Sequence, residues 1–289
     1  MSFASNHLEG SIPSYVSGWT QITTFVVNEN RLTGNLQGVF NYTAQPHITT
    51  IDVSNNQLTG QIPDYIFNIT QLTTFSAVSN CFSGTIPQAA CYSHNLTTLI
   101  LDGLRSSSTC RTGIVPGFFH SKAYILQNGI TGGIPDCLFE LGRLHTLHLS
   151  GNGLAGSIPN VAFIQPALLD LSISHNHLTG TIPAVFQQRV WYNLDLSYNR
   201  LKGTLNIPTL NYTSTDEKFY NIKLNANSIA LILRNNRLSG HIPPSVDALT
   251  NISVLEGNLF SCNLAQTDLP PHDNGAPTYQ CGSNSFNIS

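Results

Sequence analysis

Six cysteines and ten histidines are the side chains of this 289-residue sequence most suited to covalent or metal chemistry. Cysteines can pair as disulfides or ligate a metal, and His145 and His148 stand three positions apart. On a strand that spacing points the two imidazoles to opposite faces, so they cannot jointly chelate a metal. Cys-x-x-Cys, Gly-x-Ser-x-Gly and a phosphate-cradling glycine loop are absent. The sequence therefore predicts no catalytic residue, no metal site and no cofactor.

A repeated phrase, Leu-x-Gly-x-Ile-Pro, places these residues on regular elements, as in Leu58–Pro63, Leu154–Pro159 and Leu178–Pro183. An Asn stands two positions before each phrase. The series is Asn6, Asn30, Asn56, Asn80, Asn128, Asn152, Asn176, Asn199, Asn236 and Asn258, with steps of 24, 26, 24, 48, 24, 24, 23, 37 and 22 residues. A period in this range predicts a solenoid of stacked coils.

Apolar residues precede each Asn by three, five and eight positions, as Leu149, Leu147 and Leu144 precede Asn152. The alternation predicts a half-buried strand, and stacked strands form a parallel sheet with a continuous core. The Asn lies at an inward position, so we expect its amide to bond backbone groups of its own and the adjacent coil.

These motifs resemble the plant-type extracellular leucine-rich repeat found in receptor-kinase and receptor-like protein ectodomains and in polygalacturonase-inhibiting proteins. Similar arrays occur in algae and protists. The resemblance implies an α/β repeat solenoid, right-handed and curved, with a parallel concave sheet and an irregular or 3-10 convex side. We expect about ten repeats over residues 1–260 and a C-terminal disulfide cap over 261–289.

Composition limits the function. Only 9% of residues are charged and the net charge is −3, so we expect no nucleic-acid partner. The longest apolar stretches are too short for a membrane span. Met1 lies almost within a strand, since Phe3 is already inward and Asn6 is already in the series. We therefore expect a piece of a longer, secreted or cell-surface chain.

The cysteines cluster where the period is irregular. Cys81 and Cys110 each follow the Asn position in neighbouring coils, about one strand spacing of ~4.8 Å apart, and Cys91 and Cys137 flank a shortened convex segment. Cys262 and Cys281 follow the last repeat, as in caps of secreted repeat proteins. We predict Cys81–Cys110, Cys91–Cys137 and Cys262–Cys281 disulfides. Free thiols in a reducing compartment are the alternative, and connectivity does not follow from sequence alone.

Six Asn-x-Ser/Thr sequons offer N-glycosylation sites: Asn41, Asn68, Asn95, Asn211, Asn251 and Asn287. A chain so rich in Asn, Ser and Thr contains about that many by chance, so their placement matters more than their number. Asn41, Asn68 and Asn211 fall in convex or loop stretches, where a glycan would leave the core intact.

Two segments break the period. Residues 102–120 combine an insertion after one strand with a deletion on the following convex side, and residues 206–227 carry about 13 extra residues. In plant receptors similar insertions form ligand-contacting islands, whereas a surface loop is the simpler interpretation.

Outward positions on the predicted concave sheet form the natural binding face of a solenoid. They include Asp52, Tyr124, His148, Ser172 and Asp195. Beside them run the pairs Thr23-Thr24, Thr49-Thr50, Thr73-Thr74 and Thr97-Thr98, followed in the same column by Lys122 and Asp170. Stacked Thr can order water, as in ice-binding proteins, but β-branched Thr also suits a strand start.

Two functions compete. The first is a non-enzymatic extracellular module whose concave face recognises a protein or glycan, as the family resemblance implies. The second is a structural subunit of an extracellular glycoprotein filament or cell coat, in which a neighbouring protomer covers Phe3, Leu8 and Ile12. An inhibitor of the polygalacturonase-inhibiting kind would need a more charged concave face.

Overall fold

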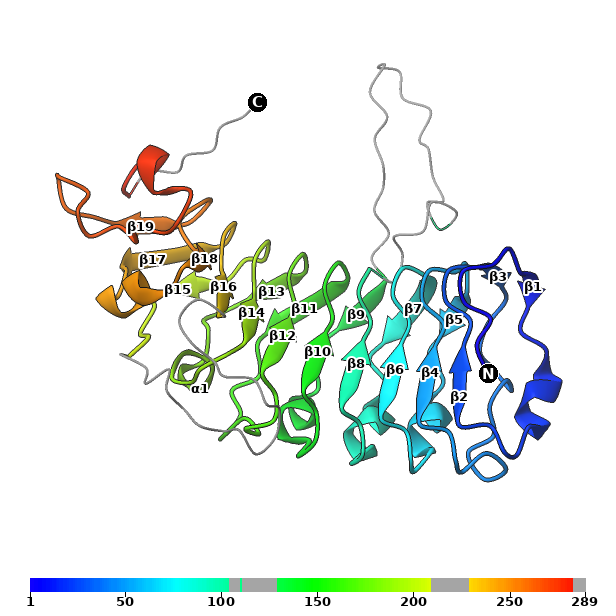
Figure 1. The fold of residues 1–289 in the computed structure, drawn as a ribbon. Helices are drawn as coiled ribbons and strands as arrows, with labels where there is room; N and C mark the ends of the chain where they lie inside the picture. The colour runs from blue at the N-terminus through cyan, green and yellow to red at the C-terminus, as the bar shows by residue number, and fades with distance from the viewer. Residues whose placement is uncertain (104–109, 111–128, 209–228, 283–289) are drawn as a thin grey trace, which may run out of the picture. The chain divides into compact units, whose positions relative to one another are not determined.

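We describe a computed structural model, which covers residues 1–103, 110, 129–208 and 229–282 (Figure 1). The chain divides into two compact units, residues 1–154 and 155–289. Both are built from short parallel strands joined by short helices, and each is described separately below.

The first unit carries a parallel sheet, here called the first sheet, of strands β2 (Thr24–Val26), β4 (Thr50–Asp52), β6 (Thr74–Ser76), β8 (Thr98–Ile100) and β10 (Thr146–His148). They lie side by side in that order (Figure 1). In each strand the central residue is buried and its neighbours are half-buried. This alternation is the pattern expected of a sheet that packs one face on the core.

A second set of strands follows the Asn positions of the first unit: β1 (Glu9–Ser11), β3 (Arg31–Thr33), β5 (Thr59–Gln61), β7 (Cys81–Thr85), β9 (Ile130–Gly132) and the start of β11 (Gly153–Ser157). Short 3-10 helices complete four of the coils: η1 (Ser14–Gly18), η2 (Asp64–Asn68), η3 (Gln88–Tyr92) and η5 (Asp136–Glu140). Each begins directly after a proline, whose fixed φ ends the preceding strand.

The second unit repeats this plan. In this unit the strands equivalent to those of the first sheet are β12 (Asp170–Ser172), β14 (Asn193–Asp195), β16 (Ala230–Ile232) and β18 (Asn251–Ser253). The remaining strands are β13 (His177–Thr179), β15 (Lys202–Gly203), β17 (Arg237–His241) and β19 (Leu259–Ser261), and the helices are α1 (Ala184–Gln187), η6 (Pro244–Ala248) and η7 (Ala276–Thr278). Parallel strands with few, short helices confirm the predicted repeat fold.

The Asn series links neighbouring coils by hydrogen bonds. Asn56 Nδ2 donates to the carbonyls of Val53 and Ser54 in its own coil, at 3.1 Å each, and of Val27 in the coil before, at 2.9 Å. Its Oδ1 accepts the N–H of Leu32 at 3.0 Å. The equivalent amide oxygens of Asn30, Asn80, Asn152, Asn199, Asn236 and Asn258 likewise accept a backbone N–H.

Eight members of the series are buried: Asn30, Asn56, Asn80, Asn152, Asn176, Asn199, Asn236 and Asn258. Asn6 is exposed, and its Nδ2 donates to the carbonyls of Phe3 and Ala4 in its own coil. Asn128 lies outside the described residues. A buried amide with both its oxygen and its nitrogen bonded stabilises the coil without leaving an unpaired polar group.

One sequence prediction about the coils is wrong. The 48-residue step of the Asn series indicated an additional strand near residues 122–124, between those at 98–100 and 146–148. Instead β8 pairs directly with β10, with Thr98 opposite Thr146, and β7 pairs with β9. Asn152 Nδ2 also donates to the carbonyl of Leu101 at 2.8 Å.

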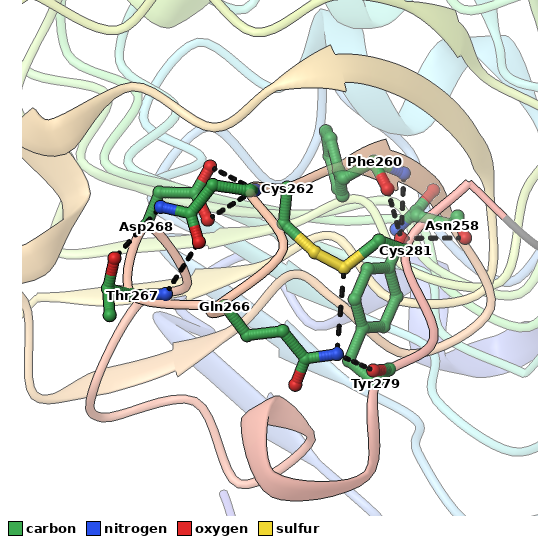
Figure 2. Close-up of a disulfide and its surroundings, with 9 residues drawn as sticks. Asn258, Phe260, Cys262, Gln266, Thr267, Asp268, Tyr279 and Cys281 are labelled. Atoms are coloured by element: carbon green, nitrogen blue, oxygen red, sulfur yellow. Dashed lines mark hydrogen bonds between the residues drawn. A yellow bond between two sulfur atoms is a disulfide. The ribbon is translucent and has the colours of Figure 1, made fainter.

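The cap of the second unit ends in a compact loop held by Cys262 and Cys281, with Cα atoms 5.5 Å apart (Figure 2). Tyr279 Oη accepts the N–H of Phe260 at 2.7 Å and donates to the carbonyl of Asn258 at 3.1 Å. Asp273 is buried, and its carboxylate accepts the N–H groups of Val254, Leu255 and Gly275. The predicted domain boundary near residue 260 stays a prediction.

Candidate functional site

The outward face of the first sheet is the surface that sequence analysis selected. In the first unit the residues after the buried strand centres form one column, Val26, Asp52, Ser76, Ile100 and His148. The residues before the centres form another, Thr24, Thr50, Thr74, Thr98 and Thr146. All ten are half-buried. Two side chains per coil thus point away from the core in fixed register.

The threonine column is longer than the sequence indicated. Lys122 was expected to follow Thr98, but Thr146 lies opposite Thr98, and Lys122 lies outside the described residues. The adjoining threonines are fixed by their hydroxyls: Thr49, Thr73 and Thr97 each donate to the carbonyl of the threonine one coil earlier, at 2.9–3.1 Å. Neighbouring hydroxyls are therefore spaced regularly, by about one strand separation of ~4.8 Å.

Polar contacts orient the column that contains Asp52, Ser76 and His148. Asp52 accepts the N–H of Ser54 at 3.0 Å, and the hydroxyls of Ser54 and Ser76 are 2.7 Å apart. His148 Nδ1 lies 3.7 Å from the carboxylate of Asp102, which also accepts the N–H of Ser150. A chain of short-range bonds therefore fixes these side chains before any ligand arrives.

His145, the other histidine considered as a metal ligand, lies directly before β10, and its backbone N–H donates to the carbonyl of Thr97. Burial lowers the pKa of this imidazole from its ordinary value. Among the described residues no group of three His, Cys, Asp or Glu side chains is placed to hold a metal ion. The arrangement suits non-covalent recognition.

In the second unit, Ser172 and Asp195 are opposite each other on β12 and β14. Asp195 accepts both the N–H and the hydroxyl of Ser197, and Asn193 donates to Asp170 at 2.9 Å. Tyr124, the remaining predicted face residue, lies outside the described residues. The structure thus places Asp52 and His148 in one column of the first unit, and Ser172 and Asp195 in one column of the second.

The cysteines form three disulfides. Cys81 and Cys110 have Cα atoms 5.4 Å apart, and Cys91 and Cys137 lie 5.5 Å apart, across the coils whose spacing is irregular. No free cysteine is found in the parts of the chain that the structure describes. The separation of Cys81 and Cys110 is close to the single strand spacing expected of equivalent residues in adjacent coils.

The sequons differ in their surroundings. Asn41, Asn68 and Asn251 are exposed, whereas Asn95 is half-buried. Asn95 Nδ2 donates to the carbonyl of Thr70 at 2.7 Å, and its Oδ1 accepts from Arg143 at 2.8 Å. Asn211 and Asn287 lie outside the described residues. Sequence reasoning could not distinguish these sites, because the sequon pattern does not report hydrogen bonding.

Sequence analysis did not select Asp273, which has a structural role in the cap. No period marks this residue, since it lies beyond the last repeat. Its carboxylate nevertheless bonds the backbone that follows β18.

Comparisons with known proteins agree with this geometry. The family model of the leucine-rich repeat matches residues 47–69, 143–162 and 167–188. No curated protein matches the chain. In the described part of the chain, no helix is both long and apolar enough to cross a membrane.

Solved structures are similar over most of the chain. The plant peptide hormone receptor RGFR1, in complex with RGF2, is 27% identical, covers 89% of this chain and 39% of its own, and has a TM-score of 0.60. The Arabidopsis receptor kinase HAESA ectodomain, in complex with an extended IDA peptide hormone, is 26% identical, with coverages of 94% and 44% and a TM-score of 0.64. This chain therefore spans less than half of either receptor chain.

A plant ice-binding protein has a TM-score of 0.68 and 20% identity, over 97% of this chain and 82% of its own. At that identity the likeness shows the fold alone. All three structures share the stacked parallel strands described above.

Proposed function

We propose that this chain, a leucine-rich repeat protein of the plant extracellular type, is a non-enzymatic module that binds a protein or glycan ligand outside the cell. The observation that carries the proposal is the outward face of the first sheet. Two columns of mostly uncharged, short polar side chains are held there in register. Such a strip suits an extended ligand, because each coil offers contacts at a constant spacing.

The chemistry of the face favours recognition over catalysis. Ser, Thr and Asp offer hydrogen-bond donors and acceptors, and their own contacts restrict their rotation, so little entropy is lost on binding. Two similar structures are complexes with ligands, the peptide hormone receptor RGFR1 with RGF2 and HAESA with an extended IDA peptide hormone. The three disulfides agree with an oxidising, extracellular location.

The test places bulky charge on the face. Peptides of about twelve residues, long enough to span several coils, are selected from a displayed library against the wild-type chain. Their affinity is then measured for the double variant Asp52→Arg/Ser76→Arg. We expect a loss of about 100-fold, since both substitutions fill the strip. Thr33→Arg, at an exposed position of β3, is the matched control and should leave affinity unchanged. Peptides that bind the double variant as tightly as wild type would place recognition elsewhere.

The second candidate, a structural subunit of an extracellular assembly, has one observation in its favour. Met1, Phe3 and Leu8 in the first coil are exposed apolar side chains. Ile12, which was expected to be exposed with them, is buried. Light scattering over a range of concentrations tests this candidate: growth of head-to-tail oligomers supports it, and a monomer at high concentration excludes it.

A further inference from the structure

A polar groove opens on the other side of the first unit, beside the turns that follow β3 and β5. It has a volume of about 360 Å³ and is lined by Asn35, Gln37, Gln61, Pro63, Asp64 and Tyr65. That volume falls within the range of small-ligand sites, roughly 300–1,000 Å³. None of its lining residues belongs to the first sheet, so the groove is separate from the face described above.

The groove lies beside a coil that lacks the Ile-Pro pair of most repeats. This coil has Leu36-Gln37, so a backbone N–H remains at position 37 that proline would lack. Asn35 Oδ1 accepts that N–H at 2.8 Å. Tyr65 Oη, from the next coil, accepts the N–H of Gly38 at 2.6 Å and donates to the carbonyl of Leu36 at 2.8 Å. The tyrosine therefore joins the two coils and forms a fixed wall of the groove.

Two glycines let the long amides lie across adjacent coils. A Cβ at Gly60 would stand 3.3 Å from Asn35 Cβ, and a Cβ at Gly84 would stand 3.0 Å from Gln61 Cγ. At the position of Gln61, neighbouring coils carry Asn35 and Thr85, and the first coil carries Ser11. The groove is thus built from side chains that are larger than the repeat requires.

The chemistry of the lining selects a ligand class. Side-chain amides and a carboxylate provide paired donors and acceptors at short range, the arrangement that hydroxyl groups require. Pro63 and the ring of Tyr65 add an apolar surface suited to the C–H face of a sugar ring. No Lys, Arg or His lines the groove, and Asp64 repels an anionic ligand.

We propose that this groove binds a neutral saccharide unit, with Gln37, Gln61 and Asp64 bonding its hydroxyls and Tyr65 and Pro63 contacting its ring. The site goes beyond the proposed function, because it lies on a different surface from the outward face of the first sheet.

Saturation-transfer NMR with cellotetraose and xylotetraose as neutral probes, and tetragalacturonic acid as an acidic one, tests the assignment. We expect transfer to at least one neutral probe and none to the acid. Gln61→Ala and Asp64→Ala should each weaken binding by about ten-fold, since each removes a hydrogen-bonding group. Both residues are exposed, so neither change should alter the thermal midpoint.

Thr181→Ala is the matched control, because Thr181 holds the repeat position of Gln61 in the second unit. It should leave binding unchanged. Absence of transfer from both neutral probes, equal binding by Gln61→Ala and wild type, or preference for the acidic probe would each overturn the proposal. Peptide binding at Asp52 and Ser76 is measured in the same variants and should persist, so failure of one site is distinguishable from failure of the other.

Discussion

At the scale of single residues, the buried asparagines are the clearest link between sequence and stability. Asn152 Oδ1 accepts the N–H of Ile130, and Nδ2 donates to three carbonyls. Asn152→Ala would leave these buried groups unpaired, so we expect unfolding free energy to fall by about 1–3 kcal/mol. Urea denaturation measures the loss. Asn160→Ala, at an exposed position, is the control and should change stability little; equal losses would contradict a special role for the buried amide.

The sequons give a second prediction at this scale. Asn41 is exposed, and its Oδ1 accepts from the hydroxyl and the N–H of Thr43. These two bonds do not use Nδ2, the atom to which a glycan would be attached. Asn95 uses both ends of its amide in contacts with Thr70 and Arg143. We expect high glycan occupancy at Asn41 and low occupancy at Asn95 in secreted material. Glycopeptide mass spectrometry reads both sites, and the reverse order would refute this ranking.

At the scale of elements, the sequence predicted the strands but gave β8 the wrong neighbour. Alternating apolar residues mark each strand because only one face is buried, so Leu147 and Leu171 identify β10 and β12 directly. The 48-residue step equals two ordinary steps, so the pattern placed another strand between those at 98–100 and 146–148. The pairing of Thr98 with Thr146 instead makes β8 and β10 neighbours.

Closure of the last coil depends on a carboxylate that no period reveals. Asp273 accepts the N–H groups of Val254 and Leu255, which follow β18. Asp273→Ala should therefore lower unfolding free energy by about 1–3 kcal/mol per unpaired group. Amide hydrogen exchange should also accelerate at Val254 and Leu255. Exposed Asp268→Ala is the comparison variant, and unchanged exchange in Asp273→Ala would show that the cap is held otherwise.

The same cap gives a pH dependence. Burial raises the pKa of Tyr279 above its ordinary 10.0, despite the opposing bond from Phe260. Above that pH the unfolded chain loses a proton that the folded state retains, so stability is complete below pH 10.0 and falls as pH rises further. Tyr279→Phe should be less stable at neutral pH yet show a shallower decline between about pH 9 and 11. A parallel decline in both proteins would exclude this tyrosine as a cause.

At the scale of the whole molecule, function was harder to predict than fold. The period identifies the stacked architecture because every coil must satisfy the same packing and hydrogen-bonding demands. The residues that line the groove, such as Gln37 and Gln61, do not stand out in the sequence, because side-chain amides are common on the surface of any repeat. Its residues come together beside a coil that lacks Ile-Pro, and the linear pattern shows that coil only as an imperfect copy of the repeat.

The asparagine bonds described above also determine how this molecule ages. Asparagine followed by glycine deamidates when the next backbone nitrogen attacks the side-chain carbonyl, a step that needs rotation of the asparagine side chain. The side chain of Asn152, which precedes Gly153, is buried and bonded to three carbonyls. The side chain of Asn274 is exposed in the cap loop, although the N–H of the following Gly275 donates to Asp273. During storage at 37 °C and mildly alkaline pH, isoaspartate should accumulate at Asn274 well before Asn152. Peptide mapping over time would show it, and early damage at Asn152 would contradict it. We therefore expect deamidation to begin in the cap, while the buried asparagines of the repeats are protected from it.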